Sequence, residues 1–119
     1  MQQQAAPPKA TKITKEQAVE YRFYGRLNLL RSEVTGNNGH KLIMQAWKVA
    51  MKLTHPDAGG SPQDAKFVNM AKEFLTDPVR REDYNNALEV HGLNDGQQKD
   101  PNFEANLKSR QNKGLTEVH

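Results

Sequence analysis

A histidine and an aspartate flank a proline near the middle of the chain, at His55, Pro56 and Asp57. An imidazole beside a carboxylate is a pairing that general acid–base catalysis uses. Catalysis also needs a nucleophile or a pocket, and the nearby Ser61 is better placed as a helix cap. Because Pro56 also holds a rigid kink between the two side chains, the sequence predicts no catalytic residues here.

Metal binding is the second chemistry that these side chains allow. The four histidines, which share no close ligand spacing, are His40, His55, His91 and His119. A helix that supplies two histidine ligands places them four residues apart. The chain has no cysteine, so disulfides and cysteine-ligated zinc are excluded. We therefore expect no metal site and no cofactor.

The residues around the tripeptide predict two amphipathic helices. Over residues 41–54, the apolar side chains fall on one broad face. The opposite face is a basic stripe of Lys41, Lys48 and Lys52, with Gln45 among them. Pro56 ends this helix, and Ser61 with Pro62 starts a second one over 62–75. The sequence thus predicts an all-α fold built on an antiparallel helical hairpin with His55-Pro56-Asp57 in the loop at its tip.

A long N-terminal helix is expected before the hairpin. Thr14 is a good N-cap and Gln17 completes a capping-box spacing. The apolar stripe of this helix is Val19, Phe23, Leu27, Leu30 and Val34. Residues 35–40 are rich in glycine and asparagine and are expected to interrupt the helical structure before the hairpin starts.

A short C-terminal helix is expected after the hairpin, from Pro78, which Asp77 can cap, to a stop at Gly92. Its inner face is predicted to consist of Val79, Tyr84, Ala87 and Leu88. The core side chains expected of the whole domain are Trp47, Phe67, Val68, Phe74, Leu75 and Tyr84.

Composition indicates one small domain with polar ends. The chain has 119 residues, of which 35% are hydrophobic and 26% charged, and its mean hydropathy is -0.90. We expect residues 1–13 to be a flexible arm and 14–91 to be the domain. Residues 92–119 are expected to be a polar tail, disordered or weakly helical over 101–113 unless a partner holds it.

The charge of the chain is mild. Seventeen basic and 14 acidic residues leave a net charge of +3, which does not support nucleic-acid binding. No stretch approaches the roughly 18 apolar residues of a membrane span. The N-terminus lacks the apolar segment of a secretory signal, so a cytoplasmic location is the default expectation.

A family resemblance extends over about residues 42–87. The segment resembles the J-domain, the co-chaperone module of DnaJ-like proteins, through AWKVAMKLTHPDAGGSPQDAKFVNMAKEFLTDPVRREDYNNA. The matching positions are Ala46, Trp47, His55, Pro56, Asp57, Asn69, Ala71, Leu75, Thr76, Asp77, Pro78, Arg80, Arg81 and Tyr84. The runs HPDAGGSP and NMAKEFL are especially similar to short J-proteins of the mitochondrial import motor. The chain departs from the family at Val49 and Leu53, where a basic residue is common.

The resemblance implies a co-chaperone and not an enzyme. J-domains dock on DnaK-type heat-shock chaperones of the seventy-kilodalton class and stimulate their ATP hydrolysis. Carried over, His55, Pro56 and Asp57 are the trigger, and Asp57 offers its charge to an arginine of the partner. Lys48 and Lys52, with Lys41, are the docking stripe, and docking through exposed charges is expected to be transient.

One alternative function and the location remain open at this stage. The chain is alternatively a structural subunit that keeps a J-domain fold inside a larger assembly, contacted through its N-terminal helix or C-terminal tail. The basic stripe is then an ordinary solvated helix face. The resemblance also adds the mitochondrial matrix, or a place within an assembly, to the cytoplasmic default.

Overall fold

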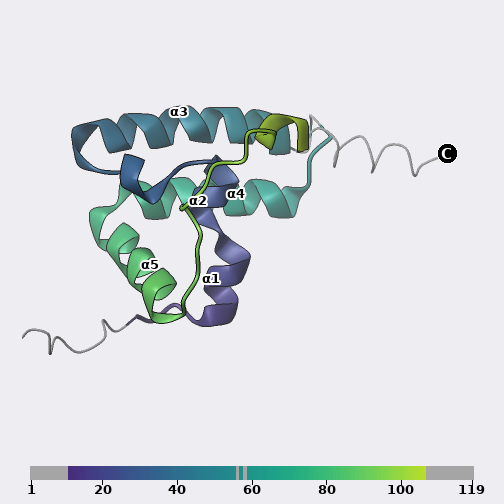
Figure 1. The fold of residues 1–119 in the computed structure, drawn as a ribbon. Helices are drawn as coiled ribbons and strands as arrows, with labels where there is room; N and C mark the ends of the chain where they lie inside the picture. The colour runs from purple at the N-terminus through teal and green to yellow at the C-terminus, as the bar shows by residue number, and fades with distance from the viewer. Residues whose placement is uncertain (1–10, 56, 58, 107–119) are drawn as a thin grey trace, which may run out of the picture.

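The computed structural model describes residues 11–55, 57 and 59–106, and these fold into helices joined by short turns (Figure 1). In chain order the elements are α1 (Lys15–Tyr21), α2 (Phe23–Leu27), the 3-10 helix η1 (Arg31–Glu33), α3 (Gly36–Thr54), α4 (Pro62–Thr76) and α5 (Pro78–Val90). A further helical turn covers residues 103–106. The all-α prediction is confirmed.

The predicted hairpin consists of α3 and α4, which run side by side in opposite directions (Figure 1). α4 is the central element, since it packs against α2, α3 and α5. The core lies between these helices, and its largest fully buried side chains are Tyr24, Tyr84, Phe23, Ile43, Leu75, Leu88 and Val68. Among the expected core residues, Phe67 is also buried, whereas Trp47 and Phe74 are partly exposed and pack against the core.

The hairpin's first helix is longer than expected, because α3 begins at Gly36 and not near residue 41. The predicted break at residues 35–40 is therefore shorter than expected, because it ends at Thr35. Gly39 is the reason: a Cβ atom there would lie 3.1 Å from the carbonyl carbon of Val34. Its missing side chain lets the chain before the helix pack directly on it, and Val34 is only 3% exposed. Close packing thus outweighs the poor helix propensity of this stretch.

The long N-terminal helix is also wrong, although its start is confirmed. Thr14 and Gln17 form the reciprocal capping box, with hydrogen bonds of 2.9 and 3.1 Å. The helix stops at Arg22, whose φ of 42° lies in the left-handed region, and α2 ends at Asn28 with a φ of 53°. The chain changes direction at each point, which leaves Val19 half exposed instead of in the core.

Partners distant in sequence satisfy the backbone groups that the break at Arg22 frees. The hydroxyl of Tyr84 accepts from the backbone N–H of Phe23 at 3.0 Å. The carboxylate of Asp95 accepts from the N–H groups of Tyr24 and Gly25 at 3.0 and 2.8 Å. Because unpaired backbone groups are costly when buried, these bonds make the broken helix stable.

The start of the described chain is fixed on α5. The Thr11 hydroxyl bonds the side chain of Asp83 at 3.1 Å, and Ile13 is 7% exposed. His91 Nε2 lies 2.9 Å from the carbonyl oxygen of Ile13. Residues 11–13, which were expected to belong to the flexible arm, are therefore part of the domain. Residues 1–10 lie outside the described residues.

The ends of the later helices follow the local signals. Ser61 accepts from the N–H of Gln63 at 3.1 Å, and Asp77 accepts from the N–H of Val79 at 2.9 Å. α5 ends at Val90, and Gly92 takes a φ of 67° just beyond it, as the predicted stop requires. Val79 is 77% exposed, so its predicted place on the inner face of α5 is wrong.

Residues 93–106, named here the C-terminal strap, return from α5 across α2 toward the end of α3 (Figure 1). Leu93 packs against the core, and Gly96 is buried. This part of the expected tail is therefore held on the body by residues of the same chain. The predicted helix over 101–113 is seen as one turn at 103–106, and residues 107–119 lie outside the described residues. Within the described residues, no helix combines the length and the apolar character needed to cross a membrane.

Candidate functional site

The tip of the hairpin begins where α3 ends. Thr54 is buried, and its hydroxyl donates to the carbonyl oxygen of Ala50 at 2.7 Å. His55 then leaves the helix with φ −63° and ψ 139°, the extended backbone that a following proline favours. Its N–H still donates to the carbonyl oxygen of Met51 at 2.9 Å. Pro56 lies outside the described residues.

A hydrogen bond between its two ends closes the loop. The N–H of Gly60 donates to the carbonyl oxygen of His55 at 3.0 Å. A Cβ atom at Gly60 would overlap the backbone of Thr54, so this position requires glycine. Gly59 takes a φ of 86°, which glycine also adopts most easily. The loop is thus a tight turn whose shape two glycines make possible.

The His55 and Asp57 side chains are linked through a backbone group. Nδ1 of His55 accepts from the N–H of Asp57 at 3.1 Å. This bond uses the lone pair of Nδ1. The Asp57 carboxylate oxygen Oδ2 lies 3.6 Å from Nδ1, and this side chain is 93% exposed. The loop therefore presents a carboxylate to solvent while the ring holds the backbone beside it.

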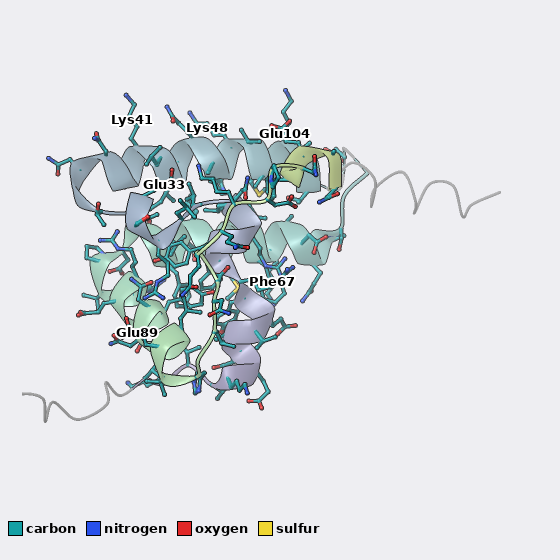
Figure 2. The ribbon with its side chains drawn as sticks, in the orientation of Figure 1. Glu33, Lys41, Lys48, Phe67, Glu89 and Glu104 are labelled. Carbon is teal, nitrogen blue, oxygen red and sulfur yellow. The ribbon has the colours of Figure 1, made fainter. Side chains whose placement is uncertain are left out.

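The basic stripe lies on the solvent side of α3. Lys41, Lys48 and Lys52 are all exposed, and Figure 2 shows Lys41 and Lys48 directed away from the body. Their spacing of seven and four residues puts them on one face of the helix. Among the described residues, no salt bridge joins any of the three lysines. The stripe thus offers unpaired positive charge that leads along α3 to the loop.

The position of α3 relative to α4 depends on a tryptophan. Trp47 Nε1 donates to the side-chain oxygen of Asn69 at 3.0 Å, and this bond joins the two helices. The ammonium group of Lys72 lies 4.3 Å from the centre of the Trp47 ring, a cation–π contact. Trp47 is partly exposed and also packs against the core.

Sequence reasoning missed Arg26 as a structural residue of this end of the hairpin. Its guanidinium donates to the carbonyl oxygens of Glu20 and Tyr21, both at 2.7 Å, and lies 3.7 Å from the carboxylate of Asp64 in the first turn of α4. It also covers the ring of Phe67 at 4.6 Å. Only 12% of the Arg26 side chain is exposed, so these partners cover most of it. No local pattern marks such a residue, because its partners lie on α1 and α4.

A buried tyrosine pair joins α2 and α5, with the rings of Tyr24 and Tyr84 in contact. Burial raises the pKa of Tyr24 to about 12. Burial, followed by the charge of the Asp95 carboxylate, also raises the pKa of Tyr84. Tyr84 donates its hydroxyl hydrogen to Asp95, which keeps both groups satisfied inside the fold. These hydroxyls are therefore structural donors at neutral pH.

Comparison with known proteins finds similarity to parts of two curated relatives. One is the tetratricopeptide repeat and J domain-containing co-chaperone DNJ1 of Cryptococcus neoformans, 36% identical over 61 residues, which is 51% of this chain and 12% of that protein. The other is the mitochondrial import inner membrane translocase subunit tim14 of Neurospora crassa, 54% identical over 37 residues, which is 31% of this chain and 35% of that protein. No protein-family model matches the chain, and no solved structure matches it significantly.

The chain thus spans only 12% and 35% of the length of these two relatives. Both similarities agree with the J-domain resemblance, and the all-helical fold with an α3–α4 hairpin agrees with it as well. Within the described residues, no group of three or more histidine, aspartate and glutamate side chains is placed to hold a metal ion.

Proposed function

We propose that this protein is a J-domain co-chaperone. It docks on a DnaK-type chaperone of the seventy-kilodalton heat-shock class and stimulates that chaperone's ATP hydrolysis. The single observation that supports this proposal most strongly is the exposed Asp57 carboxylate at the end of the helix that carries the basic stripe. ATP is hydrolysed in the partner, so the protein supplies contacts and no catalytic group.

Each part of the site has a role in this proposal. Asp57 pairs with an arginine of the chaperone, and His55 orients the backbone of Asp57 through its Nδ1 acceptor. Pro56 restricts the backbone between them, as proline does wherever it occurs. Lys41, Lys48 and Lys52 meet an acidic surface of the partner, which favours encounter and correct orientation.

Docking of this kind is weak and sensitive to salt. Exposed ion pairs contribute about 0.2–1 kcal/mol each. At about 0.15 M ionic strength, charges separated by more than about 8 Å are screened. A few such pairs and one closely fitted loop give a complex that forms and separates quickly, which suits a partner that must act in repeated cycles.

The test measures single-turnover ATP hydrolysis by each DnaK-type chaperone of the host, including the mitochondrial one because of the similarity to a mitochondrial import subunit. Wild-type protein should accelerate hydrolysis by at least one chaperone, and His55→Gln should abolish the acceleration. The matched control is His40→Gln, an identical change at an exposed residue near the start of α3, which should behave as wild type.

A different result separates the alternative. Absence of stimulation with every host chaperone, together with stable co-purification in a large complex, contradicts the co-chaperone proposal. That outcome indicates a structural subunit that uses the J-like fold as a scaffold.

A further inference from the structure

The C-terminal strap is attached to both ends of α2. At the N-terminal end, the Asp95 carboxylate accepts from the backbone N–H groups of Tyr24 and Gly25. At the C-terminal end, the side-chain amide of Asn28 donates to the carbonyl oxygen of Asp100 at 3.2 Å and accepts from the N–H of Asp100 at 2.8 Å. The strap therefore follows α2 over its whole length.

The strap is also fixed to η1. The carbonyl oxygen of Gly96 accepts from the N–H of Arg31 at 2.8 Å. A Cβ atom at Gly96 would lie 2.5 Å from the Arg31 side chain and 2.8 Å from the ring of Tyr24, so glycine is required at this close approach. Lys99 adds a salt bridge of 3.0 Å to Glu33. These contacts join the strap to residues that are far from it in the sequence.

The element under the strap holds the start of α4. Arg26 on α2 lies beside Asp64 and over the ring of Phe67, and both of these residues belong to the first two turns of α4. α4 begins directly after the loop at the tip of the hairpin. A shift of α2 is therefore transmitted to the end of the loop.

The far end of the strap reaches the base of the loop. Phe103 and Asn106 line a cavity of about 230 Å³ together with Thr54 and Asp64. Thr54 immediately precedes the loop, and Asp64 follows it in the first turn of α4. In Figure 1 the last turn of the strap lies beside the final turns of α3. The strap thus flanks both ends of the loop.

The strap leaves the basic stripe uncovered. Thr54 is buried, whereas Lys48 and Lys52 on the same helix are exposed on its opposite face. The lysines of the stripe thus stay exposed to solvent with the strap in place.

We propose that the C-terminal strap is a positioning element for the docking loop, and that Asn28 and Asp95 are its positioning residues. The strap holds α2 and the start of α4 so that the loop keeps one conformation before a partner binds. The loop then loses less conformational freedom when a partner binds, and this strengthens the binding. This inference rests on the proposed function for its effect on the chaperone, but not for its effect on the loop.

The test uses the full chain with Asn28→Gly. Glycine adopts the left-handed backbone of Asn28 without strain and removes both hydrogen bonds to Asp100. The matched control is Asn38→Gly, the same change at an exposed residue in the first turn of α3. Amide hydrogen exchange is followed in the strap and at Thr54 and Gly60, and the concentration for half-maximal stimulation of the chaperone is measured in parallel.

Loss of the two hydrogen bonds between Asn28 and Asp100 should speed amide hydrogen exchange in the strap and at Thr54 and Gly60 by about fivefold relative to the control. The half-maximal concentration should rise by a similar factor while the maximal rate stays unchanged. The inference is overturned if exchange in the strap does not change, or if the strap loosens while Thr54, Gly60 and the half-maximal concentration stay as in wild type. If wild type stimulates no chaperone, the proposed function fails, and the exchange data alone still decide whether the strap positions the loop.

Discussion

Nδ1 of His55 accepts a hydrogen bond from the backbone N–H of Asp57. This bond does not use the Asp57 carboxylate. The carboxylate is therefore free to point outward, and its side chain is 93% exposed. Under the proposed function the two side chains have separate roles: the ring maintains the turn, and the carboxylate is the group offered to a partner. The separation leads to the first prediction.

Asp57→Asn should weaken docking on the chaperone without loss of stability. The backbone bond to His55 remains, while the charge for a partner arginine is lost. Because a hydrogen bond to a charged group contributes about 1.5–3 kcal/mol, half-maximal stimulation should require roughly tenfold more protein or more. The thermal midpoint should stay unchanged. The control is Glu16→Gln, at an exposed carboxylate on α1. Full stimulation by Asp57→Asn would contradict the role of Asp57.

Replacement of Lys48 and Lys52 by alanine should weaken docking in a salt-dependent manner. Two exposed pairs at about 0.2–1 kcal/mol each predict a rise in the half-maximal concentration of about two- to thirtyfold. Since salt screens exposed charges, the difference from wild type should shrink as ionic strength increases. Lys12→Ala with Lys15→Ala, two exposed lysines at the other end of the domain, should have no effect. A defect that does not depend on salt would show that the lysines act through folding.

Gly60→Ala should destabilise the domain and distort the loop, because the added Cβ atom overlaps the Thr54 backbone. We expect a loss of roughly 2–3 kcal/mol in the free energy of unfolding, measured with urea. Gly59→Ala is the matched control: it meets open space, and its left-handed φ costs about 1 kcal/mol. Equal losses in the two variants would contradict the close approach of Gly60 to Thr54.

Alkaline pH should destabilise the protein through its buried tyrosines. Tyrosine in an unfolded chain ionises near pH 10, whereas burial raises the pKa of Tyr24 to about 12. The stability that neutral Tyr24 contributes is therefore complete below about pH 10 and is lost as pH rises from about 10 to 12, by about 2–3 kcal/mol in total. Urea unfolding at intervals across this range measures the loss.

The control for the alkaline loss is Tyr24→Phe, which removes the ionising hydroxyl and keeps the ring. This variant should show a shallower decline of stability between about pH 10 and 12. Tyr84 lies in the same buried cluster and retains part of the decline, since its pKa is also raised. A decline of the same size in wild type and Tyr24→Phe would contradict the assignment to Tyr24.

Local signals determined the parts of the fold that depend on neighbouring residues. The caps at Thr14, Ser61 and Asp77 form as predicted, and Gly92 follows the end of α5. Each depends on contacts within about one helical turn, so the residue types and spacing suffice to predict them. The exposed position of the lysines on α3 follows from the same helical period.

Contacts between distant residues decided what the sequence pattern could not. The apolar stripe from Val19 to Val34 has the period of one helix, yet the chain breaks at Arg22 because Asp95, more than seventy residues away, supplies acceptors for the freed N–H groups. Likewise, α3 extends to Gly36 because Gly39 lets Val34 approach. Neither partner is marked by local spacing.

The sequence by itself therefore determined the helical hairpin, its caps and the tripeptide at its tip, because each follows from residues adjacent along the chain. Only the tertiary structure decided that the first helix is broken and that Arg26 lies, largely covered, beside Asp64. It also decided that residues 93–106 return to flank the loop. The physical reason is that backbone groups and charges removed from water must find partners, and here those partners come from other elements of the fold.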